Sequence, residues 1–596
     1  MTNRCGGCRA IALGFLLAFL FAARPAAATI NYKVSLAHPE KHRFDVEMQV
    51  ATQPPQQNLI VALPAWNALY QVRDFAYRVR DVRAILPGSD GSFFPARKID
   101  KQTWLFPLSN TPGNVRIEYS IEWDEAGPFN SQLNPHHAFL NFAETLMYVP
   151  DRRSEAVEVA FTDVPASWRS IAELPPGATP NSFIAESYDK LVDAPVEIGK
   201  VEEFAFDNSG AHFRVVVDSK EWNRGALEDS LKRITAYDLK LMDGPPFKEY
   251  TFFFHIGPYP EVGGGGMEHS NCTAIGAGSV EMAVAIAAHE FFHAWNVKRI
   301  RPKSLEPVDY TKEQYSRALW FAEGVTSTYG SFALERSGIM SKEKWYEDLA
   351  QQICELQSRP ARKWQSVEES SLDTWFDKYD AYNLPDRSIS YYNKGQILGD
   401  LLDFAIRDAT DNHKSLDDVL RSLNESAKQG NFYDESAGIG SVVQAISGKD
   451  FGDFFRRYVS GTDEFPYDEM LAPAGLALRT EVKRTADPGF YARRAASGIT
   501  VFEVTPGGPA QQAGLRIDDV LLEANGSPVP ARLSAWMRER SPGETLTLKI
   551  RRDGQEKEVS LTLASREETH CTVAEVAHPT EKQLRIRTGM LRGTTE

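Results

Sequence analysis

The sequence predicts a multidomain α+β protein, in which an N-terminal β-domain precedes a mainly helical region and a C-terminal segment of short strands. Residues 44–50 and 115–123 alternate polar and apolar side chains with a period of two, as half-buried strands do. Residues 223–242 and 393–409 instead repeat apolar side chains at helical spacing, and strand patterns return after about residue 471. Because the chain has 596 residues, we expect three or four domains.

The N-terminus has the pattern of a signal peptide. Arg4 and Arg9 precede an apolar stretch, residues 10–23, that is too short to span a membrane, and Ala26-Ala27-Ala28 offers a small-residue cleavage site. We therefore expect residues 1–28 to be removed on export to the periplasm or the medium, which leaves no stable membrane span. The alternative is an uncleaved N-terminal anchor.

Composition excludes some functions. A net charge of -15 argues against a general nucleic-acid binder, which needs a basic face.

Cys5 and Cys8 leave with the predicted signal peptide, and the other cysteines, Cys272, Cys354 and Cys571, are widely spaced without a CxxC pair. At most one disulfide could form among these three, and we expect none.

Residues 29–200 are predicted to form a β-sandwich or curved sheet, because proline and glycine punctuate the alternating strands. No catalytic constellation stands out in this region. His136 and His137 are adjacent, and neighbouring side chains point in different directions in regular structure. We therefore expect a loop pair of histidines without a metal.

A metal-binding motif lies at His289-Glu290-Phe291-Phe292-His293, within a helix predicted over residues 279–296 and ending before Pro302. Histidines four residues apart lie on one helical face and can bind one metal, with Glu290 beside them to handle protons. Two solvated surface histidines are the alternative. The apolar residues around this helix predict that it is buried, and buried histidines need partners, which favours the metal.

A third ligand is expected on a neighbouring helix, predicted over residues 312–329. Glu323 lies there among apolar residues, where an unpaired carboxylate would be costly to bury, so it is the natural choice. Glu306 and Glu313 are alternatives in more polar surroundings.

Upstream of this motif, four consecutive glycines, Gly263 to Gly266, follow a strand predicted over residues 250–256. They indicate either a backbone that must lie close to another chain or a plain flexible turn.

Several of these motifs together resemble the glycyl-aminopeptidase family of PDZ-bearing zinc metallopeptidases, which are distantly similar to aminopeptidase N. The resemblance covers nearly the whole chain after residue 28. It rests on His289–Asn296, Trp320–Thr326, Tyr391–Gly395 and the Gly265-Gly266-Met267-Glu268-His269 stretch. This stretch is similar to an exopeptidase motif of aminopeptidase N, with His269 in place of an asparagine.

The resemblance implies a thermolysin-like zinc peptidase domain over residues 201–470 and a PDZ domain over residues 471–565. Residues 566–596 then form a C-terminal extension, either docked or partly disordered. In the PDZ domain, Gly475, Leu476 and Ala477 are expected to form the loop that binds a peptide C-terminus. The alternative is a PDZ domain that only packs.

The same resemblance completes the predicted site. One Zn²⁺ per chain is expected on His289, His293 and Glu323, with Glu290 as general base. Tyr392 should stabilise the oxyanion, with Tyr391 as the alternative. Glu268 should pair with the free α-ammonium group of a substrate that lies against Gly265, Gly266 and Met267.

These expectations describe an exported aminopeptidase that acts on peptides with free N-termini, and the resemblance implies small first residues such as glycine and alanine. Two other functions stay open. One is an endopeptidase or broader peptidase whose PDZ domain recruits substrate C-termini, and the other is a non-catalytic peptide-binding protein.

Overall fold

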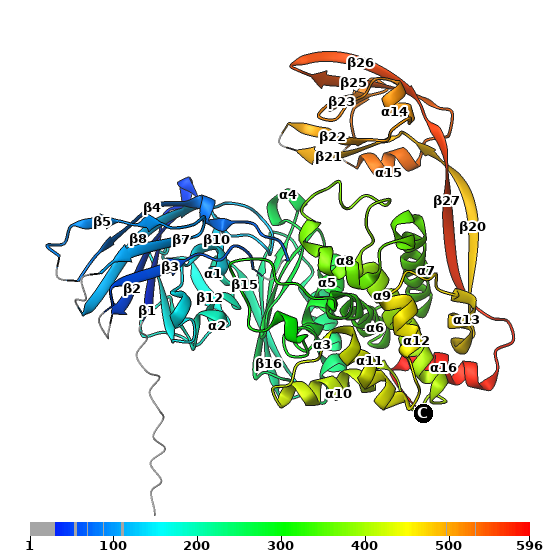
Figure 1. The fold of residues 1–596 in the computed structure, drawn as a ribbon, viewed down its shortest axis with the longest axis horizontal. Coiled ribbons are helices and arrows are strands. Elements are labelled where there is room, and N and C mark those ends of the chain that lie inside the picture. The colour runs from blue at the N-terminus through cyan, green and yellow to red at the C-terminus, as the bar shows by residue number, and fades with distance from the viewer. Residues whose placement is uncertain are drawn as a thin grey trace, which may run out of the picture.

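The computed structural model of the chain describes residues 30–52, 56–67, 70–87, 89–108, 112–495, 497–530 and 532–595. The predicted signal peptide, residues 1–28, lies outside this range. Within it, no helix combines the length and the apolar character that crossing a membrane requires. A β-domain and a helical body lie side by side, and a smaller β-rich body stands above the helices at the end of a long two-stranded ribbon (Figure 1).

The N-terminal β-domain is built from three sheets, which confirms the predicted fold class. Alternation in β2 buries Phe44, Val46, Met48 and Val50 against the same core that receives the inward face of β8. The largest sheet has the order β13-β11-β1-β2-β8-β4-β5, and the others are β12-β14-β10-β9 and β3-β7-β6. Their bounds are β1 Ile30–His38, β2 Arg43–Thr52, β3 Asn58–Ala62, β4 Val79–Ile85, β5 Phe93–Pro95, β6 Arg97–Lys98, β7 Thr103–Pro107, β8 Gly113–Glu122, β9 Gln132–Leu133, β10 His137–Leu140, β11 Val157–Thr162, β12 Arg169–Ala172, β13 Ser182–Ala185 and β14 Val196–Gly199.

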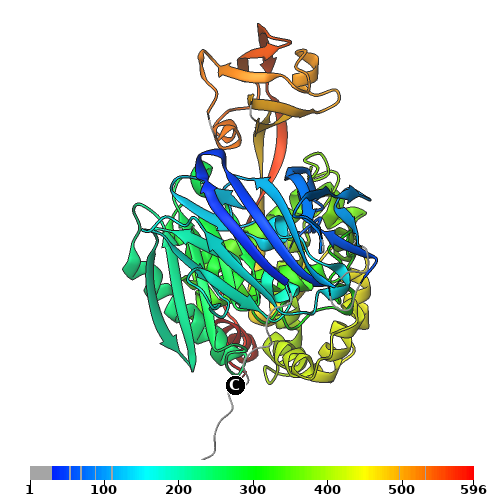
Figure 2. The same cartoon turned by 90° about the vertical axis from the view of Figure 1, so that its left-hand side faces the viewer.

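A five-stranded sheet opens the second domain, in the order β15-β16-β17-β19-β18. One face, including Phe252 and Phe254, joins the core under the helices, and the other places Val216 and Phe253 against Phe139 of the β-domain. Buried apolar side chains thus join the two domains, whose sheets lie next to each other in Figure 2. The strands are β15 Glu202–Asn208, β16 Ala211–Asp218, β17 Glu249–Ile256, β18 Gly265–Glu268 and β19 Cys272–Ala277.

Helices make up most of the rest of this domain. Helix α9 is buried along nearly its whole length, because apolar residues such as Ile397, Leu401 and Phe404 meet neighbours on several sides. The principal helices of this domain are α3 Arg224–Leu241, α5 Val280–Phe292, α6 Thr326–Arg336, α7 Lys342–Ser358, α8 Val367–Leu372, α9 Tyr391–Ala409, α10 Leu416–Lys428, α11 Glu435–Ser447 and α13 Tyr467–Leu471.

The C-terminal strands form a compact body on a ribbon. The body is a sheet in the order β21-β22-β23-β25-β26, and the ribbon pairs β20 with β27 along their full lengths. The chain then returns to the helical domain, where α16 buries Ile586 and Met590 in its core, so this helix of the predicted C-terminal extension is docked there. The bounds are β20 Leu476–Asp487, β21 Phe490–Ala495, β22 Gly498–Val504, α14 Pro509–Gln512, β23 Val520–Ala524, α15 Leu533–Arg538, β25 Thr545–Arg552, β26 Gln555–Thr562, β27 Ala564–Glu575 and α16 Glu581–Arg592.

The structure corrects the predicted carboxylate-binding loop. Gly475 lies at the base of the ribbon, where its carbonyl accepts a hydrogen bond from Arg587 (3.0 Å). Leu476 is buried in the core of the helical domain, and Ala477 pairs with Ala574 of β27. These residues therefore anchor the ribbon, and they do not lie at an edge of the PDZ sheet.

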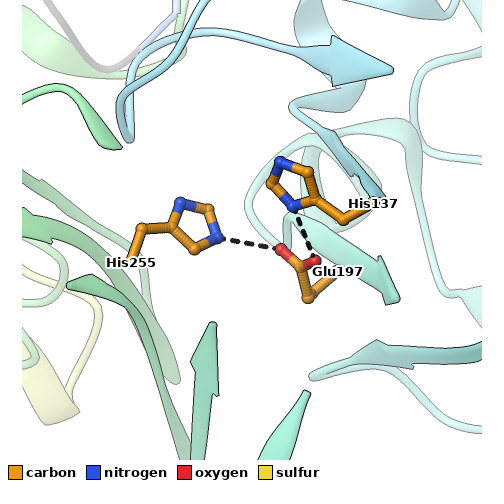
Figure 3. Close-up of side chains that lie close together, drawn as sticks. All are labelled: His137, Glu197 and His255. Atoms are coloured by element: carbon orange, nitrogen blue, oxygen red, sulfur yellow. Dashed lines mark hydrogen bonds and ion pairs between the residues drawn. The ribbon is translucent and has the colours of Figure 1, made fainter. Parts of the chain in front are cut away.

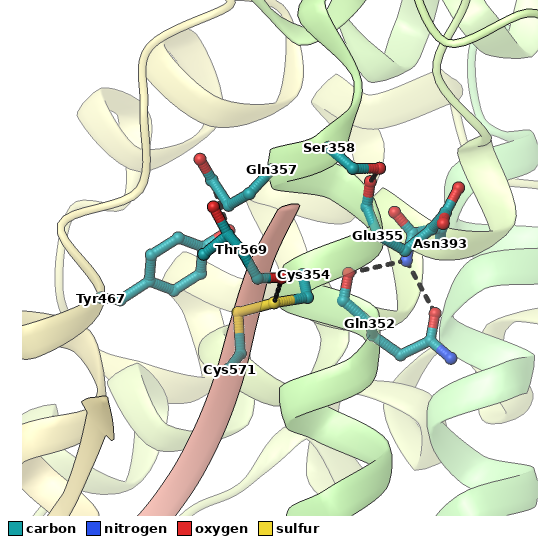
Figure 4. The surroundings of a disulfide bond; sticks show 9 residues. All are labelled: Gln352, Cys354, Glu355, Gln357, Ser358, Asn393, Tyr467, Thr569 and Cys571. Atoms are coloured by element: carbon teal, nitrogen blue, oxygen red, sulfur yellow. Dashed lines mark hydrogen bonds between the residues drawn. A yellow bond between two sulfur atoms is a disulfide. The ribbon is translucent and has the colours of Figure 1, made fainter. Parts of the chain in front are cut away.

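The expectation of no disulfide is also wrong. Cys354 of α7 and Cys571 of β27 are bonded, with their Cα atoms 5.7 Å apart, and Cys272 stays free and buried (Figure 4). The bond crosses 217 residues of sequence, a separation that no local pattern could signal. It fastens the ribbon to the helical domain, and a salt bridge between Lys342 and Glu575 (2.8 Å) does the same elsewhere along α7 and β27.

An ion pair with little solvent exposure also links the β-domain to the helical domain. Lys298 Nζ lies 2.7 Å from Asp193 Oδ1, and the backbone N–H of Ser270 donates to Asp193 Oδ2 (3.0 Å). Burial on its own raises the pKa of Asp193, but the Lys298 ammonium and His269 outweigh it and hold the pKa well below its usual range.

Asp193→Asn should destabilise the protein by about 3–5 kcal/mol at pH 7, because it leaves Lys298 unpaired. Since the pKa of Asp193 is lowered on folding, this stabilisation is complete above the unfolded pKa of about 3.9 and is lost as the pH falls below it. The measurement is thermal unfolding at a series of pH values from 7 to 3. The Tm of wild type should exceed that of the variant, and this difference in Tm should become smaller below about pH 4.

The control is Asp229→Asn, which removes an exposed ion pair with Arg233 (3.2 Å). It should lower the free energy of unfolding by about 1 kcal/mol or less. A gap for Asp193→Asn that stays constant down to pH 3 would contradict the depressed pKa.

Candidate metal centre and active site

Helix α5 carries the first two predicted ligands at its C-terminal end. Ser279 caps its N-terminus by accepting from the Met282 N–H (3.2 Å), and Ala283, Ala287 and Phe291 bury one face. The helix ends at Phe292, well before Pro302, so the predicted extent was too long. His293 is therefore the C-cap residue, and its Nδ1 lies 2.7 Å from the Asn296 carbonyl in the turn that follows.

The structure brings all three predicted ligands together. His289 Nε2 and His293 Nε2 are 2.9 Å apart, and Glu323 Oε2 lies 3.6 Å from the first and 3.2 Å from the second. The three ligand atoms thus face a common point, with His293 and Glu323 fully buried and His289 partly exposed.

Glu323 is positioned by an irregular helix. Residues 312–318 are not helical, contrary to prediction, and the helix starts with a π-helical turn, Trp320–Val325, that leads into α6. Such single π turns are common at functional sites, and this one turns Glu323 towards α5. Asn296 secures the turn by donating to the Phe321 carbonyl (2.8 Å) and to Thr326 (3.1 Å).

Asn296 and Ser327 are functional neighbours that the sequence did not reveal. The Asn296 carbonyl orients His293, and Ser327 Oγ lies 3.3 Å from His289 Nδ1. Both histidines thus turn their second ring nitrogens to oxygen atoms, an arrangement that fixes the tautomer of a metal-binding histidine.

The electrostatics of the three ligands suit a cation. Burial lowers the pKa of His289, and the same burial acts on His293, but there the Glu323 carboxylate outweighs it and raises the pKa to about 10. Burial would raise the pKa of Glu323, but the two imidazoles hold it well below its usual range. An ionised carboxylate with two imidazoles is a donor set that suits Zn²⁺.

Glu290 lies beside this centre with an unsatisfied oxygen. Its side chain is buried, its Oε2 has no hydrogen-bond partner, and burial raises its pKa to about 8. The carboxylate packs directly against the Cα of Gly266, where any side chain would overlap it. This contact accounts for one of the four glycines, because the backbone of β18 must pass close to Glu290.

Glu268, Gly266 and Tyr392 line the same cavity, of about 280 Å³. Glu268 comes from β18, the edge strand of the sheet; Gly265 and Met267 lie beside it in that strand but are not among the residues that line this cavity. Tyr392 is 40% exposed, and its ring centroid lies 6.2 Å from that of His289. The hydroxyl of Tyr391, the alternative, is buried and already hydrogen-bonded to Thr374 Oγ1 (2.9 Å).

The β-domain contributes a part of the cavity that the sequence did not predict. Tyr70 and Phe129 line it opposite the helices, so the site lies between two domains. Burial raises the pKa of the Tyr70 phenol, and the nearby carboxylates of Glu323 and Glu268 raise it further. The sequence held no signal for these contacts, because Tyr70 precedes Glu268 by almost two hundred residues.

Family comparisons agree with this architecture. Residues 31–200 match the Peptidase M61 N-terminal domain, residues 282–398 match M61 glycyl aminopeptidase, and residues 477–563 match a PDZ domain.

Among solved structures, the fold is similar to an aminopeptidase N family protein from Idiomarina loihiensis, with a TM-score of 0.80, 23% identity and coverage of 94% of this chain and 100% of the other. An M1 zinc metallopeptidase from Deinococcus radiodurans aligns at a TM-score of 0.46 and 15% identity, and the alignment covers 73% of this chain and 94% of the other.

Among curated proteins, a Marinomonas protein named "Probable periplasmic serine endoprotease DegP-like" is 28% identical over 184 residues, which are 30% of this chain and 38% of that protein. The chain thus spans well under half the length of this relative.

Proposed function

Because this chain belongs to the M61 glycyl aminopeptidase family, we propose that it is an exported, periplasmic zinc aminopeptidase that releases glycine and alanine from the N-termini of peptides. The observation that carries this proposal is the cavity in which His289, His293 and Glu323 converge, with Glu290 and Glu268 on its wall. Glu290, as a base beside the metal centre, can activate water for hydrolysis. Glu268, a carboxylate on the edge strand, can pair with the α-ammonium group of a peptide.

His289, His293 and Glu323 would hold one zinc ion. The ion would supply a Lewis acid that polarises a carbonyl group and lowers the pKa of water to about 7. The unsatisfied Glu290 Oε2 and the matched His/His/Glu donors are the features that fit such an ion.

Glu290 and Tyr392 act on the substrate itself. Glu290 takes a proton from the attacking water and returns one to the leaving amine, and its burial beside Gly266 keeps its carboxylate aimed into the cavity. Tyr392 lines the same cavity beside His289 with a partly exposed ring, and its phenol can donate to the oxyanion.

Glu268 binds the N-terminus of the substrate and so determines which peptide bond lies at the metal centre. An extended peptide can pair with the open edge of β18, whose other edge pairs with β19. In that arrangement the α-ammonium group would meet Glu268, whose pKa is raised by desolvation in this partly buried position.

The experiment that tests the function measures free amino acids released from Gly- and Ala-peptides, with and without N-acetylation. We expect rapid release from the free peptides and only slow residual hydrolysis of the acetylated ones. Internal cleavage of both forms would favour an endopeptidase, and no hydrolysis of either form by zinc-loaded protein would contradict catalysis.

Contacts between the PDZ body and the helical domain favour the endopeptidase as second candidate. Arg387 Nη2 lies 3.7 Å from Glu503 Oε1, and Arg493 pairs with Asp380, so the PDZ body touches the segment that leads into Tyr391. A peptide C-terminus held at a PDZ edge strand such as β21 would then lie near the active-site entrance.

Glu268→Ala should lower kcat/KM for free-amine peptides by about 10²-fold, because a buried charge-assisted contact is lost. Residual activity on N-acetylated peptides should stay unchanged. The control, Glu261→Ala, removes an exposed carboxylate that does not line the cavity, and it should leave both rates unchanged. Equal losses on the two substrate forms for Glu268→Ala would refute its role as the amine anchor.

A further inference from the structure

A second group of histidine and carboxylate side chains lies outside the active site, where the β-domain meets the sheet of the helical domain. His137, Glu197 and His255 turn their polar atoms towards one another (Figure 3). His137 Nδ1 is 3.0 Å from Glu197 Oε1, and His255 Nε2 is 2.9 Å from Glu197 Oε2. His137 was predicted to lie in a loop, but it begins strand β10 and is buried.

A fourth donor completes the group. Asp218 Oδ2 lies 3.5 Å from His137 Nδ1, and Asp218 is the register partner of His255 on the neighbouring parallel strand. His137 and Glu197 likewise share one face of the β10–β14 pair, since His137 is opposite Gly199. Each domain therefore contributes one histidine and one carboxylate.

We propose that His137, Glu197, His255 and Asp218 form a second metal site, which binds a divalent transition ion such as Zn²⁺ and joins the β-domain to the catalytic domain.

The distances support this assignment. Ligand atoms about 2.0–2.1 Å from a tetrahedral zinc ion lie roughly 3.3–3.5 Å apart. The distances from Glu197 to the two histidines and from Asp218 to His137, 2.9 to 3.5 Å, are close to those among His289, His293 and Glu323, which run from 2.9 to 3.6 Å. Two imidazoles and two carboxylates carry the charge that balances a divalent ion, and imidazole and carboxylate ligands suit zinc.

The surroundings are built like those of a metal centre. Gln132 Oε1 lies 3.0 Å from His137 Nε2, so the second nitrogen of that ring has a partner that fixes its orientation. Gly199 leaves the space that His137 and the Glu197 carboxylate occupy, because a Cβ there would press on both. Phe139 packs edge-on against the His255 ring (centroids 5.1 Å apart) and keeps water from that side.

The coordination also indicates the role of the ion. Four protein ligands leave no open position, which is characteristic of structural sites and not of catalytic ones. Since the ligands come from both domains, bound metal would hold the wall that carries Tyr70 and Phe129 against the active-site cavity. The same four side chains without a metal would be a buried hydrogen-bonded ion pair, and the experiment separates these two states.

The test measures metal content in the full chain with the first site removed. The purified His289→Ala/His293→Ala variant is stripped with chelator, equilibrated with buffered Zn²⁺ and analysed by mass spectrometry for zinc per chain. We expect one zinc ion in this variant, none after adding His255→Ala or Glu197→Gln, and two in wild type. One zinc ion should remain when the exposed His212, which pairs with Asp207, is replaced by alanine in the same background.

Zinc should also raise the Tm of the double variant by roughly 5 °C at 100 times its Kd, a shift that vanishes when Glu197→Gln is added. Circular dichroism identifies variants that remain folded, and Glu197→Gln keeps the shape of the side chain. No zinc and no Tm shift in the folded double variant would overturn the proposal and leave the cluster as an ion pair.

Discussion

Glu290→Gln should lower kcat by about 10²–10⁴-fold on Gly- and Ala-peptides while the protein keeps its metal. The amide has the size of the carboxylate but cannot accept the proton of the attacking water, so the base contribution is lost. His289, His293 and Glu323 are unchanged, and their mutual distances do not depend on Glu290. The measurement is steady-state hydrolysis together with zinc per chain on the same preparation.

A matched control lies on the same helix. Glu281→Gln makes the same chemical change in the first turn of α5, where the side chain is exposed and far from the cavity. It should leave kcat within about twofold of wild type. Turnover near the wild-type rate in Glu290→Gln would move the general base elsewhere, and loss of zinc there would give Glu290 a role in metal binding.

The metal ligands could be predicted from sequence because their spacing is local. His289 and His293 are one helical turn apart, and Glu323 is marked by the apolar residues around it. The helix boundaries were less predictable, since the turn at His293 and the π turn at Glu323 depend on Asn296, a contact between separate segments. The identity of the ligands thus follows from local sequence patterns, whereas their positions depend on tertiary contacts.

Other features were beyond the reach of local patterns for the same reason. His137 finds its partner Glu197 60 residues away, and Glu197 meets His255 after 58 more. The Cys354–Cys571 bond joins segments that meet only because the ribbon returns over α7. Alternation in β2 and β8 needs only neighbouring residues, and it predicted the β-domain correctly.

The misplaced PDZ loop has a related physical cause. Gly475 has a positive φ of 62°, and a glycine before a strand is a feature that a carboxylate-binding loop and a simple turn share. Here the turn connects Ala472–Ala474 to the ribbon, and β27 takes the backbone groups that a peptide would need. Only strand pairing across almost one hundred residues distinguishes the two arrangements.

Gly266→Ala should abolish most of the activity without unfolding the protein. A Cβ at this position would overlap the Glu290 side chain, so the carboxylate must leave its place beside β18. A displacement of about 1 Å in a catalytic group can cost about 10² in rate, and we expect at least that loss in kcat. Zinc content should be unchanged, because the three atoms nearest to the added Cβ all belong to Glu290 and not to a metal ligand.

Gly278→Ala is the control, since a Cβ there meets nothing within 4 Å. It lies just before α5 and should keep both the Tm and kcat of wild type. Gly266→Ala in a Glu290→Ala background separates two causes of the loss, measured on the residual rate. Because alanine lacks the Cγ and the carboxylate that the new Cβ would overlap, Gly266→Ala should cost much less there than in wild type. Equal costs in both backgrounds would mean that Gly266 acts through the path of the substrate along β18 and not through Glu290.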